Sequence, residues 1–148
     1  MTTMEWTEDL IGRCSSPKMY HIDRDTLKQF SRSLELTYPP YFDPEAARSE
    51  GYRDIIAPPT FAFTLTAGDI PGLELPDAGI IHGEQQFEYA LPLTAGDEVH
   101  VVACIDNLKK RGSTVFLTLK TIAHNTHNEM VFVSRSLFII TLDKESAL

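Results

Sequence analysis

His82 and Glu84 stand two residues apart in IIHGEQQFEY, where polar and apolar residues alternate. An imidazole beside a carboxylate can pass a proton to or from a ligand, which is general acid–base chemistry. A period of two predicts a strand with both side chains on one face, and with Gln85 on the opposite face, buried and bonded to backbone. A solvated polar face explains the same pattern, so both interpretations of His82 and Glu84 stay open.

Lys109, Lys110 and Arg111 form the densest cationic cluster in a chain of formal net charge −8. Gly112 follows, where a hairpin turn often needs a positive φ. Such a cluster is most often a solvated turn, but a phosphorylated ligand needs positive charges of this kind. The acidic balance argues against general nucleic-acid binding, which needs a basic surface.

The two cysteines, Cys14 and Cys104, are too few for a disulfide framework, and they lack metal-ligand spacing. The spacing of His124 and His127 does not predict a metal site either. We expect Cys104 to be a small core residue of an apolar strand, and the chain to work in a reducing, cytoplasmic compartment. The first residues lack the apolar core of a signal peptide, and no apolar run reaches the roughly 18 residues of a membrane span.

The first half of the chain predicts short helices joined by proline-rich loops. Asp23 is placed to cap a helix over residues 23–34. Asp43, followed by Pro44, is placed to begin a second helix over residues 45–50, which Gly51 ends. Residues 59–67 are apolar on nearly all sides, which predicts a short buried helix.

From Gly79 onward the period changes to two and predicts four strands joined by short turns. Residues 131–142 are apolar on both faces, as in a central strand. Consecutive strands with tight turns pair antiparallel, and their apolar face needs a cover, which the helix over residues 59–67 can supply. An antiparallel sheet wrapped around one apolar helix is the hotdog fold, in the α+β class. The 148 residues fit a single domain of this kind.

Three stretches carry a resemblance to a known family. FSRSLELTYPPYFDPEAA, at residues 30–47, resembles the signature of MaoC-like enoyl-thioester hydratases. GYRDIIAPPTF and IIHGEQQFEYALPLTAGDEV resemble the amino-terminal dehydratase domain of that superfamily, and KKRGSTVFLTLKTIAHNTHNEMVFVSRSLFII resembles its last two strands. The resemblance implies a hotdog fold, a dimer that joins two sheets, and acyl thioesters of coenzyme A or acyl carrier protein as substrates, with no further cofactor or metal.

The chain departs from this family at the positions that carry out catalysis. Catalytic members have an Asp and, five residues on, a His in the pattern G-D-x-N-P-x-H. Aligned through Pro39, this chain has Leu36 at the Asp position, Tyr38 at the Asn position and Tyr41 at the His position. Leucine cannot transfer a proton, and tyrosine is a poor base near neutral pH. Such a loss is typical of the partner subunit in two-part MaoC-like dehydratases.

The resemblance therefore implies the acyl-thioester-binding subunit of an enoyl-thioester hydratase or 3-hydroxyacyl dehydratase. It would act as a homodimer or as a heterodimer with a catalytic MaoC-like subunit. Tyr38 and Tyr41 either pack at the sheet edge or dimer seam, or line the acyl channel. Two alternatives stay open: a self-sufficient hydratase or thioesterase that uses His82 or Glu84, and a non-enzymatic acyl-CoA-binding hotdog protein.

Overall fold

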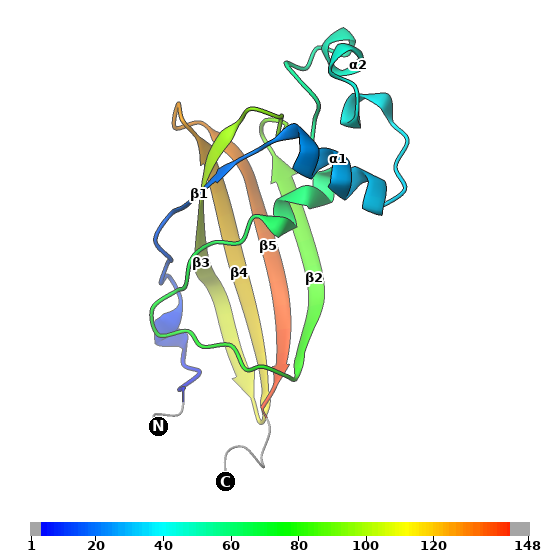
Figure 1. Ribbon diagram of the computed structural model, residues 1–148. Coiled ribbons are helices and arrows are strands. Elements are labelled where there is room, and N and C mark those ends of the chain that lie inside the picture. The colour runs from blue at the N-terminus through cyan, green and yellow to red at the C-terminus, as the bar shows by residue number, and fades with distance from the viewer. Residues whose placement is uncertain (1–3, 143–148) are drawn as a thin grey trace.

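One antiparallel sheet forms the frame of the molecule (Figure 1). The computed structural model describes residues 4–142. The five strands lie in the order β1-β3-β4-β5-β2. Their bounds are β1 (Lys18–His21), β2 (Ile80–Tyr89), β3 (Glu98–Arg111), β4 (Thr114–Asn125) and β5 (Met130–Thr141). Because β5 lies between β4 and β2, the prediction of an interior strand near residues 131–142 is confirmed.

Short helices precede β2 and lie over or beyond the sheet. They are the α-helices α1 (Arg24–Ser33) and α2 (Pro44–Ser49), and the 3₁₀-helices η1 (Glu8–Leu10), η2 (Pro39–Tyr41) and η3 (Pro59–Thr64). In Figure 1, α2 lies beyond the upper end of the sheet, and η3 lies over the sheet below α1. Within residues 4–142, every helix is too short or too polar to cross a membrane.

Side-chain caps confirm both predicted helix starts. Asp23 Oδ1 accepts a hydrogen bond from the backbone N–H of Thr26 at 2.7 Å, and Asp43 Oδ1 accepts one from Glu45 at 3.0 Å. Each carboxylate satisfies a backbone donor that has no partner inside the helix, which sets the residue at which the helix begins. Gly51 follows α2 with a φ of +94°, the left-handed geometry that glycine adopts without steric cost.

Contacts on two sides hold α1 in place. Arg24 donates from Nε and Nη2 to the two carboxylate oxygens of Asp54 at 2.9 and 2.7 Å, and this bond lowers the pKa of Asp54. Leu27 is fully buried, and the ring of Phe30 meets that of Phe61 edge-on with centroids 5.2 Å apart. The helix is therefore anchored both to the loop before η3 and to η3 itself.

The apolar stretch after Pro59 does not form the predicted regular helix over residues 59–67. It forms η3, which ends at Thr64, and irregular chain then continues to β2. The segment contains three threonines, which have low helix propensity, and Gly68 follows it. A helix of so few residues also gains little to offset its nucleation cost. Phe61 is buried as predicted, whereas Phe63 is 47% exposed. The sheet is therefore covered only by a short 3₁₀-helix and irregular chain, which together form a thin cover.

Cys14 and Cys104 form a disulfide, and Cys104 is only partly buried, so the prediction that Cys104 is a small core residue is wrong. The chain before β1 runs antiparallel along β3, and the backbone N–H of Ser15 donates to the carbonyl of Ala103 at 2.8 Å. This register brings the cysteines opposite each other with their Cα atoms 4.0 Å apart. Cysteine spacing alone cannot reveal such a register. The cysteine count therefore no longer supports a reducing compartment, and the cytoplasmic location stays a prediction.

Large apolar side chains gather at the two ends of the sheet, on the face that η3 covers, here called the covered face. The cluster near α1 includes Leu27, Ile55, Phe61, Val99 and Phe132. The cluster near the β3–β4 turn includes Trp6, Leu10, Leu108, Val115, Leu117 and Ile140. Between the clusters the strands carry smaller side chains, and the thin cover does not fill the space above them.

Candidate functional site

A cavity of about 790 Å³ lies between the covered face and the chain at residues 62–75. Its floor is made by β3, β4 and β5 through Ala103, Leu119, Thr121, Ser134, Ser136 and Phe138. Its roof includes Phe63, Leu65, Ala67, Ile70, Leu73 and Leu75. The volume falls in the range of about 300–1,000 Å³ for small-molecule sites, which are likewise mostly apolar with few polar groups. The cavity therefore suits the hydrocarbon chain of a small-molecule ligand.

Three hydroxyl side chains interrupt the apolar floor. Thr121 of β4 lies directly opposite Ser134 of β5, and Ser136 follows two residues later on the same face. Ser134 and Ser136 are only 6% and 7% exposed. Burying a hydroxyl costs free energy unless the hydroxyl is hydrogen-bonded. These three side chains are therefore polar groups that favour a hydrogen-bonding partner at defined positions of the floor.

A β-bulge at Gly83 changes the predicted relationship between His82 and Glu84. The register of β2 against β5 shifts between these two residues, because a bulge adds one residue to one strand and interrupts the period of two. His82 pairs with Phe138 and lies on the covered face together with Gln85, whereas Glu84 lies on the opposite face. The prediction that His82 and Glu84 share a face, opposite Gln85, is therefore wrong.

Gln85 connects the cavity floor to His82. Its side-chain oxygen Oε1 accepts a hydrogen bond from the Ser136 hydroxyl at 2.6 Å and lies 2.9 Å from Nε2 of His82. Its nitrogen donates to the carbonyl of Gln86 at 3.3 Å. Gln85 is half-buried and bonds mainly to side chains, which corrects the prediction that it is buried and bonded to backbone.

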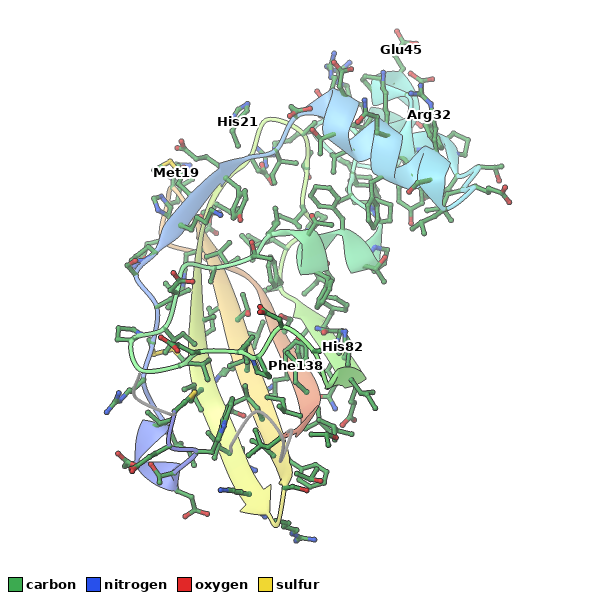
Figure 2. The ribbon with its side chains drawn as sticks, turned by 60° about the horizontal axis from the view of Figure 1, so that its bottom comes forward. Met19, His21, Arg32, Glu45, His82 and Phe138 are labelled. Atoms are coloured by element: carbon green, nitrogen blue, oxygen red, sulfur yellow. A yellow bond between two sulfur atoms is a disulfide. The ribbon has the colours of Figure 1, made fainter. Side chains whose placement is uncertain are left out.

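The imidazole of His82 lies between two phenylalanine rings. Its centroid is 4.9 Å from that of Phe63 and 5.0 Å from that of Phe138, and both of these residues line the cavity. Figure 2 shows His82 and Phe138 next to each other, on β2 and β5. Because His82 is itself exposed, it stands at the rim of the cavity.

Leu36, Tyr38 and Tyr41 lie in the link between α1 and α2, and none of them lines this cavity. The rings of Tyr38 and Tyr41 meet edge-on with centroids 5.1 Å apart. Desolvation, with a smaller effect of Glu50, raises the pKa of Tyr38, so its hydroxyl stays protonated. In Figure 2, Arg32 of α1 and Glu45 of α2 lie well away from His82.

Lys109, Lys110 and Arg111 end β3, at the opposite end of the sheet from α2 (Figure 1). All three are exposed, and none is among the residues that line the cavity. Gly112 follows with a φ of +61°, as expected for the hairpin turn. A contact with a phosphorylated carrier stays a prediction for these side chains.

Tyr89 holds the roof of the cavity to the edge of the sheet. Its hydroxyl donates to the carbonyl of Pro59, the first residue of η3. Burial raises the pKa of Tyr89 to about 12. The sequence placed Tyr89 on the face of Gln85, but the contact with η3 depends on how the chain folds back and was not predicted.

The cavity contains no pair of groups suited to general acid–base catalysis. Among its lining residues only Asp69 and Glu74 have acidic or basic side chains, and both occupy exposed loop positions. Within residues 4–142, no group of three or more His, Cys, Asp or Glu side chains is arranged to hold a metal ion. The cavity can bind the hydrocarbon part of a ligand, and the hydroxyl groups of its floor can form hydrogen bonds with the ligand's polar groups.

Residues 9–134 match the family described as FAS1-like, dehydratase domain region. The chain belongs to this family. It is 31% identical over 150 residues to a UPF0336 protein of Streptomyces griseus, with 97% of this chain and 100% of the relative covered. A UPF0336 protein of Saccharopolyspora erythraea is 34% identical over 143 residues, with 92% of each chain covered. The prediction that the chain contains a dehydratase domain of this type is thereby confirmed.

Solved structures with the same fold include subunits of two complexes from Mycobacterium tuberculosis. A chain of the C-terminally truncated HadBC (3R-hydroxyacyl-ACP dehydratase) complex matches this family member with a TM-score of 0.77 and 22% identity, covering 91% of this chain and 99% of that one. A chain of the ChsH1–ChsH2 complex matches with a TM-score of 0.70 and 17% identity, covering 89% and 90%. The predicted hotdog fold is confirmed.

The polar residues of the cavity, Thr121, Ser134 and Ser136, were not predicted from the sequence. One signal was present in the sequence: Ser134 and Ser136 stand two residues apart in a strand that is mostly apolar. Two buried hydroxyls on one face of a core strand favour a polar contact there. The bulge at Gly83 and the cavity itself leave no comparable signal in the sequence, because both depend on how other parts of the chain fold.

Proposed function

We propose that this chain is the acyl-thioester-binding, non-catalytic subunit of an enoyl-thioester hydratase or 3-hydroxyacyl dehydratase. The acyl chain occupies the cavity above Ser134 and Ser136, and the thioester is carried by coenzyme A or acyl carrier protein. A second hotdog subunit supplies the Asp and His that add water to the enoyl double bond or reverse that addition.

The observation that carries this proposal is the contrast between the cavity and the family's catalytic positions. The cavity has the size and apolar lining of an acyl site. The positions of the catalytic Asp and His hold Leu36 and Tyr41, neither of which can act as a base near neutral pH. A chain that keeps the ligand site without the proton-transfer groups fits the binding half of a two-part enzyme.

The edge of the sheet supports a partner of the same fold. β2 is an edge strand, and it exposes Ile81 at 61% on the face of the sheet opposite the cavity. On the covered face, the roof residue Phe63 is 47% exposed. An edge strand has unpaired backbone groups that can pair with another strand. HadBC and ChsH1–ChsH2 are themselves complexes, which is consistent with a hotdog subunit on this edge.

A self-sufficient hydratase or thioesterase is the second candidate, and one observation favours it. His82 lies at the cavity rim and on the covered face, within reach of a ligand. However, Glu84, the carboxylate predicted to work with it, lies on the opposite face. His82 therefore lacks the expected acid–base partner.

Blocking the cavity tests the proposal. Ser134→Leu adds a branched side chain to the floor and should weaken saturated acyl-CoA binding by about tenfold, because each excluded methylene costs about 0.8 kcal/mol. Ser134→Ala, the matched control, keeps the space and should bind as the wild type does. Affinity would be measured by titration calorimetry. Equal binding by Ser134→Leu and wild type would place the acyl chain elsewhere, and no binding by wild type would contradict the proposed function.

A further inference from the structure

The hydrogen bonds of Gln85 determine which nitrogen of His82 is free. The Gln85 nitrogen donates to the carbonyl of Gln86, which places the amide oxygen against Ser136 and His82. An amide oxygen only accepts, so both of these partners donate to it. The proton of neutral His82 is therefore on Nε2, and Nδ1 carries a lone pair.

Nothing in the described chain uses that lone pair. Among residues 4–142, the hydrogen bonds of His82 involve Nε2 and leave Nδ1 without a protein donor. The phenylalanine rings on either side, Phe63 and Phe138, hold the imidazole in one orientation. A fixed ring with one satisfied nitrogen and one free acceptor is pre-organised to bind a ligand donor.

The local backbone is built to present this ring to the cavity. The bulge at Gly83 turns His82 onto the covered face, and a side chain at Gly83 would crowd Ile139, whose Cδ1 lies 3.1 Å from the position of a Cβ there. A regular strand would have pointed His82 away from the cavity. The bulge, the two phenylalanine rings and Gln85 thus together fix the position and orientation of the His82 side chain.

We propose that Nδ1 of His82 accepts a hydrogen bond from a hydroxyl group on the acyl part of the bound thioester. The inference rests on the proposed function, because the acyl chain must lie in the cavity for its hydroxyl to reach the rim. Gln85 and Ser136 are positioning residues that act through His82. A saturated chain has no donor to offer, so this subsite distinguishes a hydroxyacyl ligand from an unsubstituted one.

The test compares a 3-hydroxyacyl-CoA with the saturated acyl-CoA of the same chain length, so that contributions of the carrier cancel. The wild-type chain should bind the hydroxyacyl ligand about three- to tenfold more tightly, as expected for one net hydrogen bond. His82→Phe keeps an aromatic ring between Phe63 and Phe138 but lacks the acceptor. It should bind both ligands with the affinity that wild type has for the saturated one.

Equal affinities in wild type, or a preference that survives in His82→Phe, would overturn the inference and leave the proposed function intact. Failure of wild type to bind either ligand would overturn both. The positioning role of Gln85 has its own readout, because nitrogen NMR distinguishes the two tautomers. Wild type should show the proton on Nε2 of His82, and Gln85→Leu should release it to a mixture. An unchanged tautomer in Gln85→Leu would contradict that role.

Discussion

Cys14 and Cys104 face each other across an antiparallel bridge and are joined by a disulfide. The bond fastens the amino-terminal segment along β3, close to the roof of the cavity. In that segment Arg13 donates from Nη1 to the carbonyl of Pro71 at 3.4 Å, and Leu10 shares an apolar cluster with Ile70 of the roof. The disulfide therefore supports both the sheet edge and the chain that covers the cavity.

Breaking this disulfide should lower stability. The bond closes a loop across a sequence separation of 90, and loss of such a crosslink typically costs about 2–5 kcal/mol in the free energy of unfolding. Urea unfolding of the wild type with and without a dithiol reductant measures the difference. Cys14→Ser is the control, and its unfolding should not respond to the reductant. Identical curves for oxidised and reduced wild type would show that the crosslink contributes nothing.

Tyr89 should make the protein sensitive to high pH. Its folded-state pKa is raised to about 12, above the value of about 10 for an unfolded tyrosine. The stabilisation is therefore fully present below pH 10 and is lost as pH rises from about 10 to 12, because the unfolded chain loses the proton first. Urea midpoints across this range should fall more steeply in wild type than in Tyr89→Phe.

At neutral pH, Tyr89→Phe should also lower the free energy of unfolding by about 1 kcal/mol, because it removes the hydrogen bond to Pro59. Parallel curves for the two proteins would contradict this role.

The basic hairpin gives a test of the carrier contact. Changing Lys109, Lys110 and Arg111 together to Ser should weaken acyl-CoA binding by up to about tenfold at low salt, because exposed charge pairs contribute little each and are screened. The affinity should also depend less on salt. A control variant with Lys28→Ser and Arg32→Ser removes charge from α1 at the other end of the molecule and should bind normally. Wild-type affinity in the triple variant at low salt would rule out the contact.

The parts of the fold that could be predicted from sequence are those whose structure is determined by residues close together in the chain. Asp43 and Pro44 satisfy the start of α2 within a single turn, and alternation along β4 reflects burial of one face only. The helix over residues 59–67 was predicted from its apolar pattern, but its threonines and its short length outweigh that pattern. Which side chains face the cavity could not be predicted at β2, because one inserted residue at Gly83 moves His82 to the other face.

The candidate site was predictable only in part for the same physical reason. His82 is recognisable as a chemically capable residue from its type, and its neighbour Gln85 from its place in the strand. Their partners Ser136 and Phe138 come from a strand more than forty residues later in the sequence, brought alongside by pairing of β5 with β2. The pairing of Cys14 with Cys104 likewise depends on register between distant segments.

Hydration of an enoyl-CoA by the purified chain tests the central claim most directly. General acid–base catalysis contributes roughly 10²–10⁴-fold, so a chain with Leu36 and Tyr41 at the catalytic positions should show almost no hydration above background. Addition of a hotdog partner that carries the Asp and His should restore it, and Leu36→Asp with Tyr41→His should restore only part, because small misplacements of catalytic groups are costly. Robust hydration by the wild-type chain alone, abolished in His82→Ala and unchanged in Tyr41→Phe, would contradict the account and place the active site at His82.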